Sequence, residues 1–156
     1  MSKYNSKGVS VVSIKLIKEG SFLYEKRKCT TSQAAYGLFS SFIEDKANEQ
    51  LVVAALNVKE EPVNISTVHI GTILSSMAIP RDVVRTAILS NAPSIIVVHN
   101  HPSGDTTPSK ADISFTQELY KACELLQIKL LDHLIIGFWW KLSFNEIKRL
   151  VWGSKQ

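Results

Sequence analysis

Three short runs of apolar residues constrain the fold of this 156-residue chain more than any other feature. They are LVVAALNV (51–58), SIIVVH (94–99) and IKLLDHLIIG (128–137). Runs of this length with many β-branched residues are typical of strands buried on both faces. Segments with helical spacing of apolar residues lie between them. The sequence therefore predicts an α/β sandwich, in which a mixed sheet is flanked by helices.

Start signals and periodicity predict the remaining elements. Three predicted helices begin at N-cap or proline residues and cover 31–44, 80–91 and 108–127, and a last short helix is predicted over 144–152. The predicted strands outside the three runs cover 9–17, 21–29, 63–71 and 138–143. Strands 9–17 and 21–29 are expected to be joined by a tight turn, and 63–71 to pair with 51–58.

Length and composition indicate the class of protein. A chain of 156 residues with 45% apolar and 21% charged residues is typical of one globular domain, here residues 1–156. The N-terminus does not resemble a signal peptide, and Lys129, Asp132 and His133 interrupt the most apolar late stretch. We therefore expect a cytoplasmic protein without a membrane span. Cys29 and Cys123 form no C-x-x-C pattern and are expected to be free thiols.

The stretch HNHPSGDTTPSKAD (99–112) directly follows the second apolar run and contains a candidate metal site. His99 and His101 lie on the same side of an extended backbone, because side chains repeat every two residues. Both imidazoles can therefore point to one place. Asp112 falls in the first turn of the next predicted helix. Two histidines and one carboxylate leave a fourth position open for water, which is the pattern of a catalytic zinc site.

Simpler interpretations of these residues stay open at this point. Ser109 and Asp112 also form an S-x-x-D capping box, and HPSGD can be a plain turn. His133 is expected to be a hydrogen-bonded core histidine, with a role as a remote ligand as the alternative. A hydrolytic site also needs a base for its water, and spacing does not choose among the candidates Glu44, Glu49, Glu60 and Glu61.

The spacing H-x-H-x7-S-x2-D of residues 99–112 resembles the signature of the JAMM (JAB/MPN) metalloproteases without a gap. HNHPSG, PSKAD and LDHLIIG further resemble the RadC branch of that superfamily, and LVVAALNVK, GTILSS and PRDVVRTAIL match the same branch in order. The resemblance covers about residues 30–145. Two departures stand out. The helix-hairpin-helix module usual in RadC proteins is not expected here, and Ile79 replaces a histidine found in many relatives.

The resemblance implies a cytidine-deaminase-like α/β sandwich around a curved sheet. It implies three zinc ligands, His99, His101 and Asp112. Glu49 would be the general base, and Ser109 would donate a hydrogen bond to the developing oxyanion. In this interpretation the carboxylate of Asp112 faces the metal rather than the helix backbone. Ser103 and Thr106 are candidates for orienting the histidines.

Three functions of different classes follow from these patterns. The first is a zinc-dependent hydrolase, of peptidase or isopeptidase type, that acts on a peptide or protein. The alternative is a DNA-associated protein of the RadC repair type. The net charge of +4 allows DNA as a partner, although the basic residues are scattered and only EKRK (25–28) is a tight group. A non-catalytic scaffold is the third, but no motif residue has been lost. A homodimer stays open, and Trp139, Trp140 and Trp152 can stack on bases or complete a core or dimer contact.

Overall fold

The computed structural model describes residues 8–43, 45–71, 79–138 and 141–144. Within these residues the chain forms the helices α1 (Ser32–Ile43), α2 (Pro80–Leu89) and α3 (Lys110–Leu125). The strands are β1 (Gln50–Leu56), β2 (Pro62–Ile70), β3 (Ser94–Asn100), β4 (Lys129–Ile136) and β5 (Lys141–Ser143). None of the described helices combines the length and the apolar run that crossing a lipid bilayer requires.

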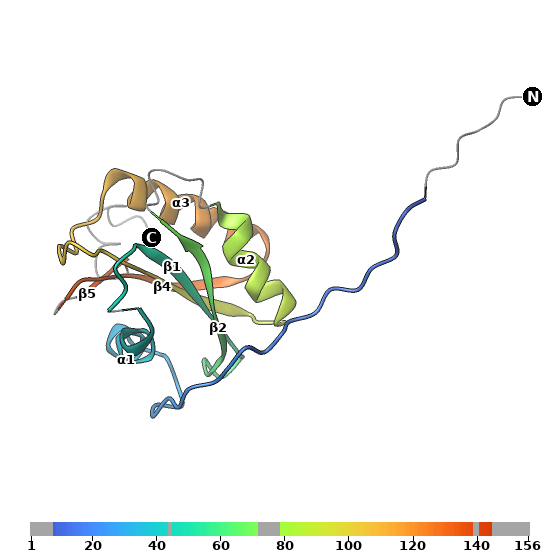
Figure 1. Cartoon of the computed structure of the whole chain (residues 1–156), viewed down its shortest axis with the longest axis horizontal. Helices are drawn as coiled ribbons and strands as arrows, with labels where there is room; N and C mark the ends of the chain where they lie inside the picture. Colours follow the sequence, from blue (N-terminus) through green and yellow to red (C-terminus); the bar gives the residue numbers. More distant parts are fainter. Residues whose placement is uncertain (1–7, 44, 72–78, 139–140, 145–156) are drawn as a thin grey trace, which may run out of the picture.

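The strands form one mixed sheet in the order β2-β1-β3-β4-β5 (Figure 1). β1 is antiparallel to both β2 and β3, whereas β3 and β4 are parallel, because α3 carries the chain back between them. The turn between β1 and β2 is closed by the Asn57 side chain, whose Oδ1 accepts from the backbone N–H groups of Lys59 and Glu61. The predicted α/β fold on a mixed sheet is therefore confirmed.

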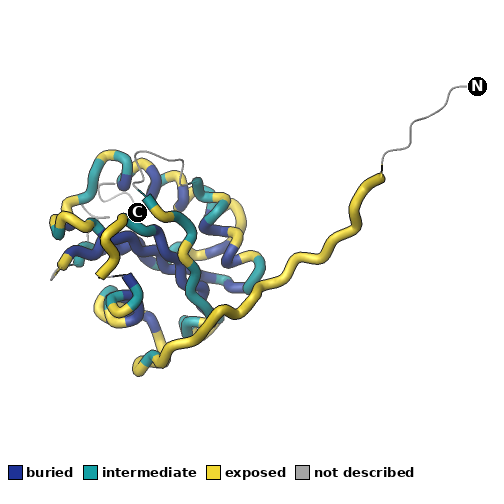
Figure 2. The backbone as a smooth tube through the Cα atoms, in the orientation of Figure 1, coloured by how far each residue is buried: buried dark blue, intermediate teal, exposed yellow. Residues whose placement is uncertain are grey.

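Helices cover both faces of this sheet. The face that includes Val52 and Val98 packs against α1, and the face that includes Val53 and Val97 packs against α2 and α3. Figure 2 shows the central strands as the most buried part of the described chain. Burial on both faces explains why the strands have continuous apolar sequences rather than alternating ones. A polar side chain on these strands needs a partner inside the protein.

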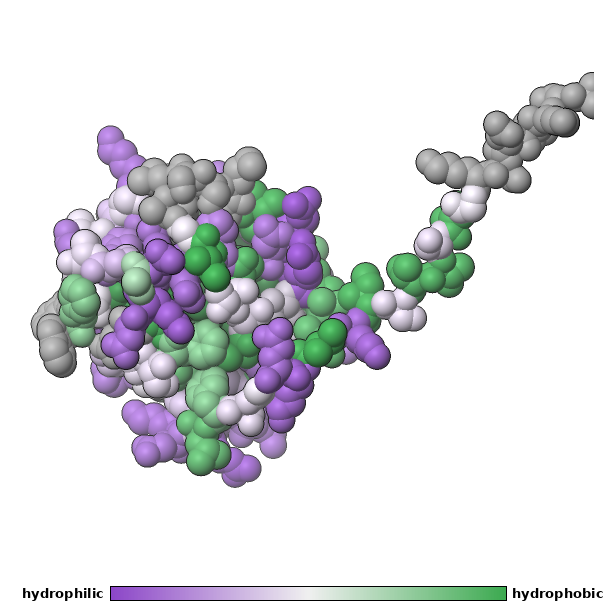
Figure 3. Space-filling model, in the orientation of Figure 1, coloured by the Kyte–Doolittle hydropathy of each residue, from purple (hydrophilic) through white to green (hydrophobic). Residues whose placement is uncertain are grey.

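The prediction of two strands over 9–17 and 21–29 is wrong. Residues 8–31 contain no strand, and the first part of this segment extends away from the body with the apolar side chains of Val9, Val11 and Ile14 in solvent, as Figure 3 shows for the projecting arm. Alternation of apolar and polar residues indicates that a segment suits a sheet. A strand also needs a neighbouring strand whose backbone groups pair with its own. The segment is attached only near its end, where the Tyr24 hydroxyl donates to the Ala34 carbonyl and the Cys29 N–H donates to the Glu60 carbonyl.

The other expectations have mixed outcomes. Of the strand predicted over 138–143, the described residues contain β5 at Lys141–Ser143, and residues 139 and 140 lie outside the described chain. Apart from Phe144, the predicted last helix lies outside the described residues, as do Trp139, Trp140 and Trp152. Cys29 and Cys123 are free and buried, as expected.

Candidate metal centre

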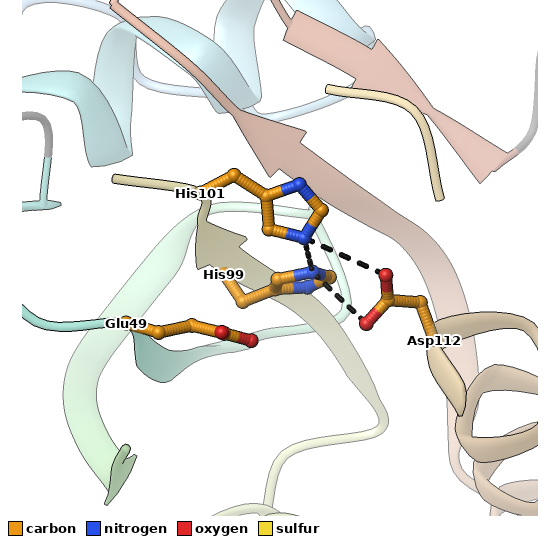
Figure 4. Close-up of side chains that lie close together, drawn as sticks. All are labelled: Glu49, His99, His101 and Asp112. Atoms are coloured by element: carbon orange, nitrogen blue, oxygen red, sulfur yellow. Dashed lines mark hydrogen bonds and ion pairs between the residues drawn. The ribbon is translucent and has the colours of Figure 1, made fainter. Parts of the chain in front are cut away.

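Four side chains with metal-binding atoms meet at the end of β3 (Figure 4). They are Glu49, His99, His101 and Asp112, and their ligand atoms all lie within 4.8 Å of one another. The Nε2 atom of His99 lies 3.3 Å from Asp112 Oδ1, and that of His101 lies 3.5 Å from Asp112 Oδ2. His99 and Asp112 are buried, whereas His101 and Glu49 are half-buried. The cluster is therefore reached from solvent on the side of His101 and Glu49.

Three separate elements bring these residues together. His99 lies on β3, and in the antiparallel ladder it pairs with Leu51 of β1. The start of β1 therefore lies beside the end of β3, which brings Glu49 near the histidines although Glu49 and His99 are 50 positions apart in the sequence. Asp112 reaches the same point from the first turn of α3, because the loop after β3 turns back over the sheet.

The first turn of α3 has two roles at once. Ser109 is the N-cap, and its Oγ accepts a hydrogen bond from the Asp112 N–H (3.1 Å). In return, Asp112 Oδ2 accepts from the Ser109 N–H (2.7 Å). The expectation that this carboxylate faces the metal position instead of the helix backbone is therefore wrong, because the carboxylate faces both. Asp112 caps the helix through Oδ2 while its Oδ1 faces His99, and the hydroxyl proton of Ser109 remains available to another acceptor.

A chain of hydrogen bonds determines which nitrogen of His99 faces the cluster. The Thr116 hydroxyl donates to the Asp112 carbonyl (2.6 Å), so its oxygen accepts from His133 Nδ1 (2.7 Å). The proton of His133 is thereby placed on Nδ1, and its Nε2 accepts from His99 Nδ1 (2.8 Å). The lone pair of His99 then lies on Nε2, which points to Asp112. Burial holds the pKa of His133 well below its usual value, which matches a neutral, accepting imidazole.

The ring of His101 is oriented in a similar way. Its Nδ1 lies 2.6 Å from the Asp105 carbonyl oxygen, which can only accept, so Nδ1 carries the proton. The lone pair on Nε2 then faces the cluster. The predicted orienting residues are not the ones found in these roles. The Ser103 hydroxyl accepts from the Asp105 N–H, and the Thr106 methyl lies near Gly137.

The structure confirms His133 as a hydrogen-bonded core histidine, but its role in holding His99, and the role of Thr116, were not predicted, because these residues are not adjacent in sequence. His133 lies on β4, and the parallel register places it beside Val97, two residues before His99. Thr116 lies one helical turn after Asp112. A histidine within a continuous apolar run was the available signal for His133, but the sequence did not give the register that makes it a partner of His99.

Mutual interactions shift the pKa values of two of these groups. Burial alone would raise the pKa of the Asp112 carboxyl, but the interaction of the charged carboxylate with the adjacent imidazoles of His101 and His99 outweighs burial and holds this pKa well below its usual range. The hydrogen bond to Asp112 raises the pKa of His101. In the absence of a metal ion, the Asp112 carboxylate thus favours a proton on His101. The same carboxylate would be a ligand if a metal ion took the place of that proton.

Two glycines fix the loop that follows β3 against the end of β4. Gly104 has a φ of +85°, and a Cβ there would lie 2.6 Å from the Phe138 ring. A Cβ on Gly137 would collide with the backbone of Gly104. The His101 N–H donates to the Ile136 carbonyl (2.9 Å), so the loop continues the register of the parallel pair. The backbone that carries Asp105 and orients His101 is therefore packed so closely against the end of β4 that neither Gly104 nor Gly137 has room for a Cβ.

The other candidate bases lie elsewhere or outside the described residues. Glu60 and Glu61 belong to the turn between β1 and β2, at the opposite end of β1 from Glu49. Glu61 accepts a hydrogen bond from the Asn57 side chain there. Glu44 lies outside the described residues. Of the candidates that the structure describes, Glu49 is the one that lies at the cluster.

Known proteins resemble most of this chain. A family model described as the RadC-like JAB domain matches residues 29–149. A UPF0758 protein of Chlorobaculum parvum is 44% identical over 111 residues, which cover 71% of this chain and 50% of the relative. For a UPF0758 protein of Staphylococcus haemolyticus the identity is 44% over 113 residues, covering 72% of this chain and 50% of the relative. The chain thus spans about half the length of the curated relatives it matches.

Proposed function

The chain belongs to the RadC-like JAB domain family, and on this premise we propose that it is a metal-dependent hydrolase that cleaves amide bonds in a peptide or protein. The observation that supports this most directly is a convergence of acceptors. The Nε2 atoms of His99 and His101 lie 2.9 Å apart, beside the Asp112 carboxylate, and both Nδ1 protons are donated elsewhere. Lone pairs at this separation repel unless a proton or a metal cation lies among them.

The donor set suits a zinc ion. Two imidazole nitrogens and one carboxylate oxygen are ligands that Zn²⁺ prefers, and three protein ligands leave one coordination position open. When bound, Zn²⁺ would lower the pKa of a water molecule to about 7 and polarise the substrate carbonyl. His99, His101 and Asp112 would hold the ion, with their orientation supported by His133, Thr116 and the Asp105 carbonyl.

Two further residues would act on the protons and charge of the reaction. A carboxylate oxygen of Glu49 lies within 4.8 Å of the ligand atoms of the other three residues, which is close enough to serve a water molecule between them. Glu49 would take a proton from the attacking water and give it to the leaving amine nitrogen. The Ser109 hydroxyl, whose oxygen already accepts from the Asp112 N–H, has its proton free to stabilise the developing oxyanion.

Metal content tests the first half of this proposal. The purified chain is expected to contain about one zinc ion, as three protein ligands per ion predict, and to lose it in His99→Ala and in Asp112→Ala. His69→Ala is the matched control, because His69 lies on β2 outside the cluster, and it should keep the ion. Elemental analysis of the native protein measures the outcome. A folded protein that binds no divalent metal with all ligands intact would contradict the proposal.

Amide hydrolysis tests the second half. Glu49→Gln should keep the metal and lower kcat by about 10²–10⁴-fold, which is the usual contribution of a general base. Fluorogenic peptides and isopeptide-linked lysine conjugates are the substrates to compare. Glu49→Gln with wild-type kcat would show that the base lies elsewhere. Cleavage of DNA but not of amides would favour the alternative function raised from the sequence.

A further inference from the structure

Asn100, the residue between the two histidines, has a buried side chain that is bonded to the segment preceding β1. It is only 2% exposed. Its Oδ1 accepts from the Gln50 N–H (2.7 Å), and its Nδ2 donates to the carbonyl oxygens of Lys46 and Asn48 (both 3.2 Å). One carboxamide thus binds backbone groups on both sides of Glu49.

The backbone ladder does not reach this far. The pairing of β1 with β3 ends at Leu51 and His99, so Gln50 has its N–H bonded to a side chain rather than to a β3 carbonyl. Residues 45–48 are exposed and contain no helix or strand. From the other side, the Gly71 N–H donates to the Glu49 carbonyl (2.8 Å). Glu49 is therefore held between the end of β2 and the Asn100 carboxamide.

Alternation along β3 lets this carboxamide act without competing for the metal position. Side chains repeat every two residues, so Asn100 faces away from His99 and His101, toward the layer of α1. The chain leaves α1 on that side before it enters β1. The tripeptide His99-Asn100-His101 thus presents two imidazoles on one face and an amide on the other.

We infer that Asn100 is a positioning residue that sets the place of the Glu49 carboxylate relative to the two histidines. The inference rests on the proposed role of Glu49 as the base. Only an amide of this size offers one acceptor and two donors at this position. Aspartate keeps the size and the acceptor, but in place of the amide nitrogen it would turn one carboxylate oxygen toward the carbonyl oxygens of Lys46 and Asn48.

The test compares the near-isosteric variant Asn100→Asp with Asn57→Asp. Asn57 is a matched control, because its carboxamide also binds turn backbone, but at the opposite end of β1. Asn100→Asp should keep the metal, leave KM unchanged and lower kcat by about 10- to 100-fold, as a small misplacement of a reacting group does. Asn57→Asp should keep wild-type kcat. Asn100→Ser serves as a second variant that removes the amide without adding a charge.

A double variant shows whether Asn100 acts through Glu49. In the Glu49→Gln background, Asn100→Asp should cause no further loss of kcat, because the group that it positions is already gone. An undiminished loss in that background would overturn the inference, since Asn100 would then act by another route. Wild-type kcat in both Asn100 variants would overturn it as well.

Hydrogen exchange of the metal-free protein gives an independent readout. The amides of residues 46–50 should exchange faster in both Asn100 variants, while those of the β1 core, Val52–Ala55, stay protected. If Glu49→Gln keeps full activity, the proposed role of Glu49 fails, but faster exchange would still show that Asn100 fastens this segment. Unchanged exchange of residues 46–50 would overturn the positioning role even if Glu49 is the base.

Discussion

At the scale of single residues, the two candidate histidine ligands have their tautomers set by neighbours. His99 donates to His133, and His101 donates to the Asp105 carbonyl. A ligand fixed in this way does not need to reorient when an ion binds, so less entropy is lost. The two supports differ in kind, because His133 is a buried side chain on β4 and the Asp105 carbonyl belongs to an exposed loop.

The support from His133 can be tested with two substitutions of different chemistry. His133→Leu leaves the His99 Nδ1–H without an acceptor, and loss of such an outer partner typically lowers metal affinity about 10- to 100-fold. His133→Gln offers an amide oxygen to the same N–H and should recover part of the affinity. Competition with a chromophoric chelator measures both. Wild-type affinity in the leucine variant would mean that the orientation of His99 does not depend on His133.

The Asp112–His101 pair predicts how the stability of the metal-free protein depends on pH. The pKa of Asp112 is lower in the folded than in the unfolded chain, so its contribution is present above about pH 3.9 and is lost as the pH falls through the folded pKa. The pKa of His101 is raised, so its contribution is present below about pH 6.5 and is lost as the pH rises through the folded pKa. Both contributions are present between about pH 4 and 6.5.

Urea denaturation with a chelator present, from pH 3 to pH 8, measures this dependence. The wild type should exceed Asp112→Asn in free energy of unfolding most strongly within the window, and the difference should shrink on either side. Asparagine keeps an acceptor for the Ser109 N–H, so the helix cap is largely retained in the control. A difference that is constant with pH would contradict the predicted coupling.

At the scale of elements, the first turn of α3 joins a helix cap to the cluster. The same Ser109 that satisfies the Asp112 N–H is the proposed oxyanion donor, so a loss of stability and a loss of rate are easily confused. Two substitutions separate them. Ser109→Ala should cost about 1 kcal/mol of stability, whereas Ser109→Gly should cost only a few tenths, because glycine is a tolerated N-cap.

Both Ser109 variants lack the hydroxyl, so both should lower kcat by a similar factor, about 10²–10³-fold if the hydroxyl stabilises the oxyanion. Ser109→Thr keeps the hydroxyl and should stay close to wild type in both respects. Thermal unfolding and kcat on one amide substrate give the comparison. If the glycine variant kept full activity, the hydroxyl would serve the helix cap alone.

The spacing of apolar residues predicted the helices and strands that pair with elements close in sequence, and the strands that are buried on both faces. The continuous runs became β1, β3 and β4, and the N-cap and proline signals located the starts of α1, α2 and α3. Residues 9–29 have strand-like alternation but no pairing partner within the described chain, which periodicity cannot detect. The capping box and the candidate ligand were treated as competing interpretations of Asp112, although the two carboxylate oxygens allow both.

At the scale of the whole molecule, the cluster is assembled from segments far apart in the chain. The sequence motif located His99, His101 and Asp112 as candidates, and family resemblance selected Glu49 from the four candidate bases. His133, Thr116 and Asn100 could not be assigned from spacing, because their roles depend on the sheet register and on which face each side chain occupies.

The extended N-terminal segment should contribute little to the stability of this assembly. Residues 8–20 are all exposed, and exposed residues typically contribute within roughly 0.5 kcal/mol, so removal of residues 1–20 should change the melting temperature by less than about 2 °C. Extension of the deletion through Cys29 removes a buried side chain and the bond from Tyr24 to α1, and should cost at least about 2 kcal/mol. Equal losses for the two deletions would show that residues 8–20 pack against the folded body.

The contact between Gly104 and Gly137 has a consequence for how such sequences vary. Position 137 lies outside the cluster, yet glycine is the only residue that fits there, because even a methyl group would collide with the Gly104 backbone. Ser103 and Asp105, which lie in the loop itself, expose their side chains and can vary more freely. Gly137, which directly follows β4, therefore carries more information than most loop residues about whether a related chain can form the same cluster of candidate metal ligands.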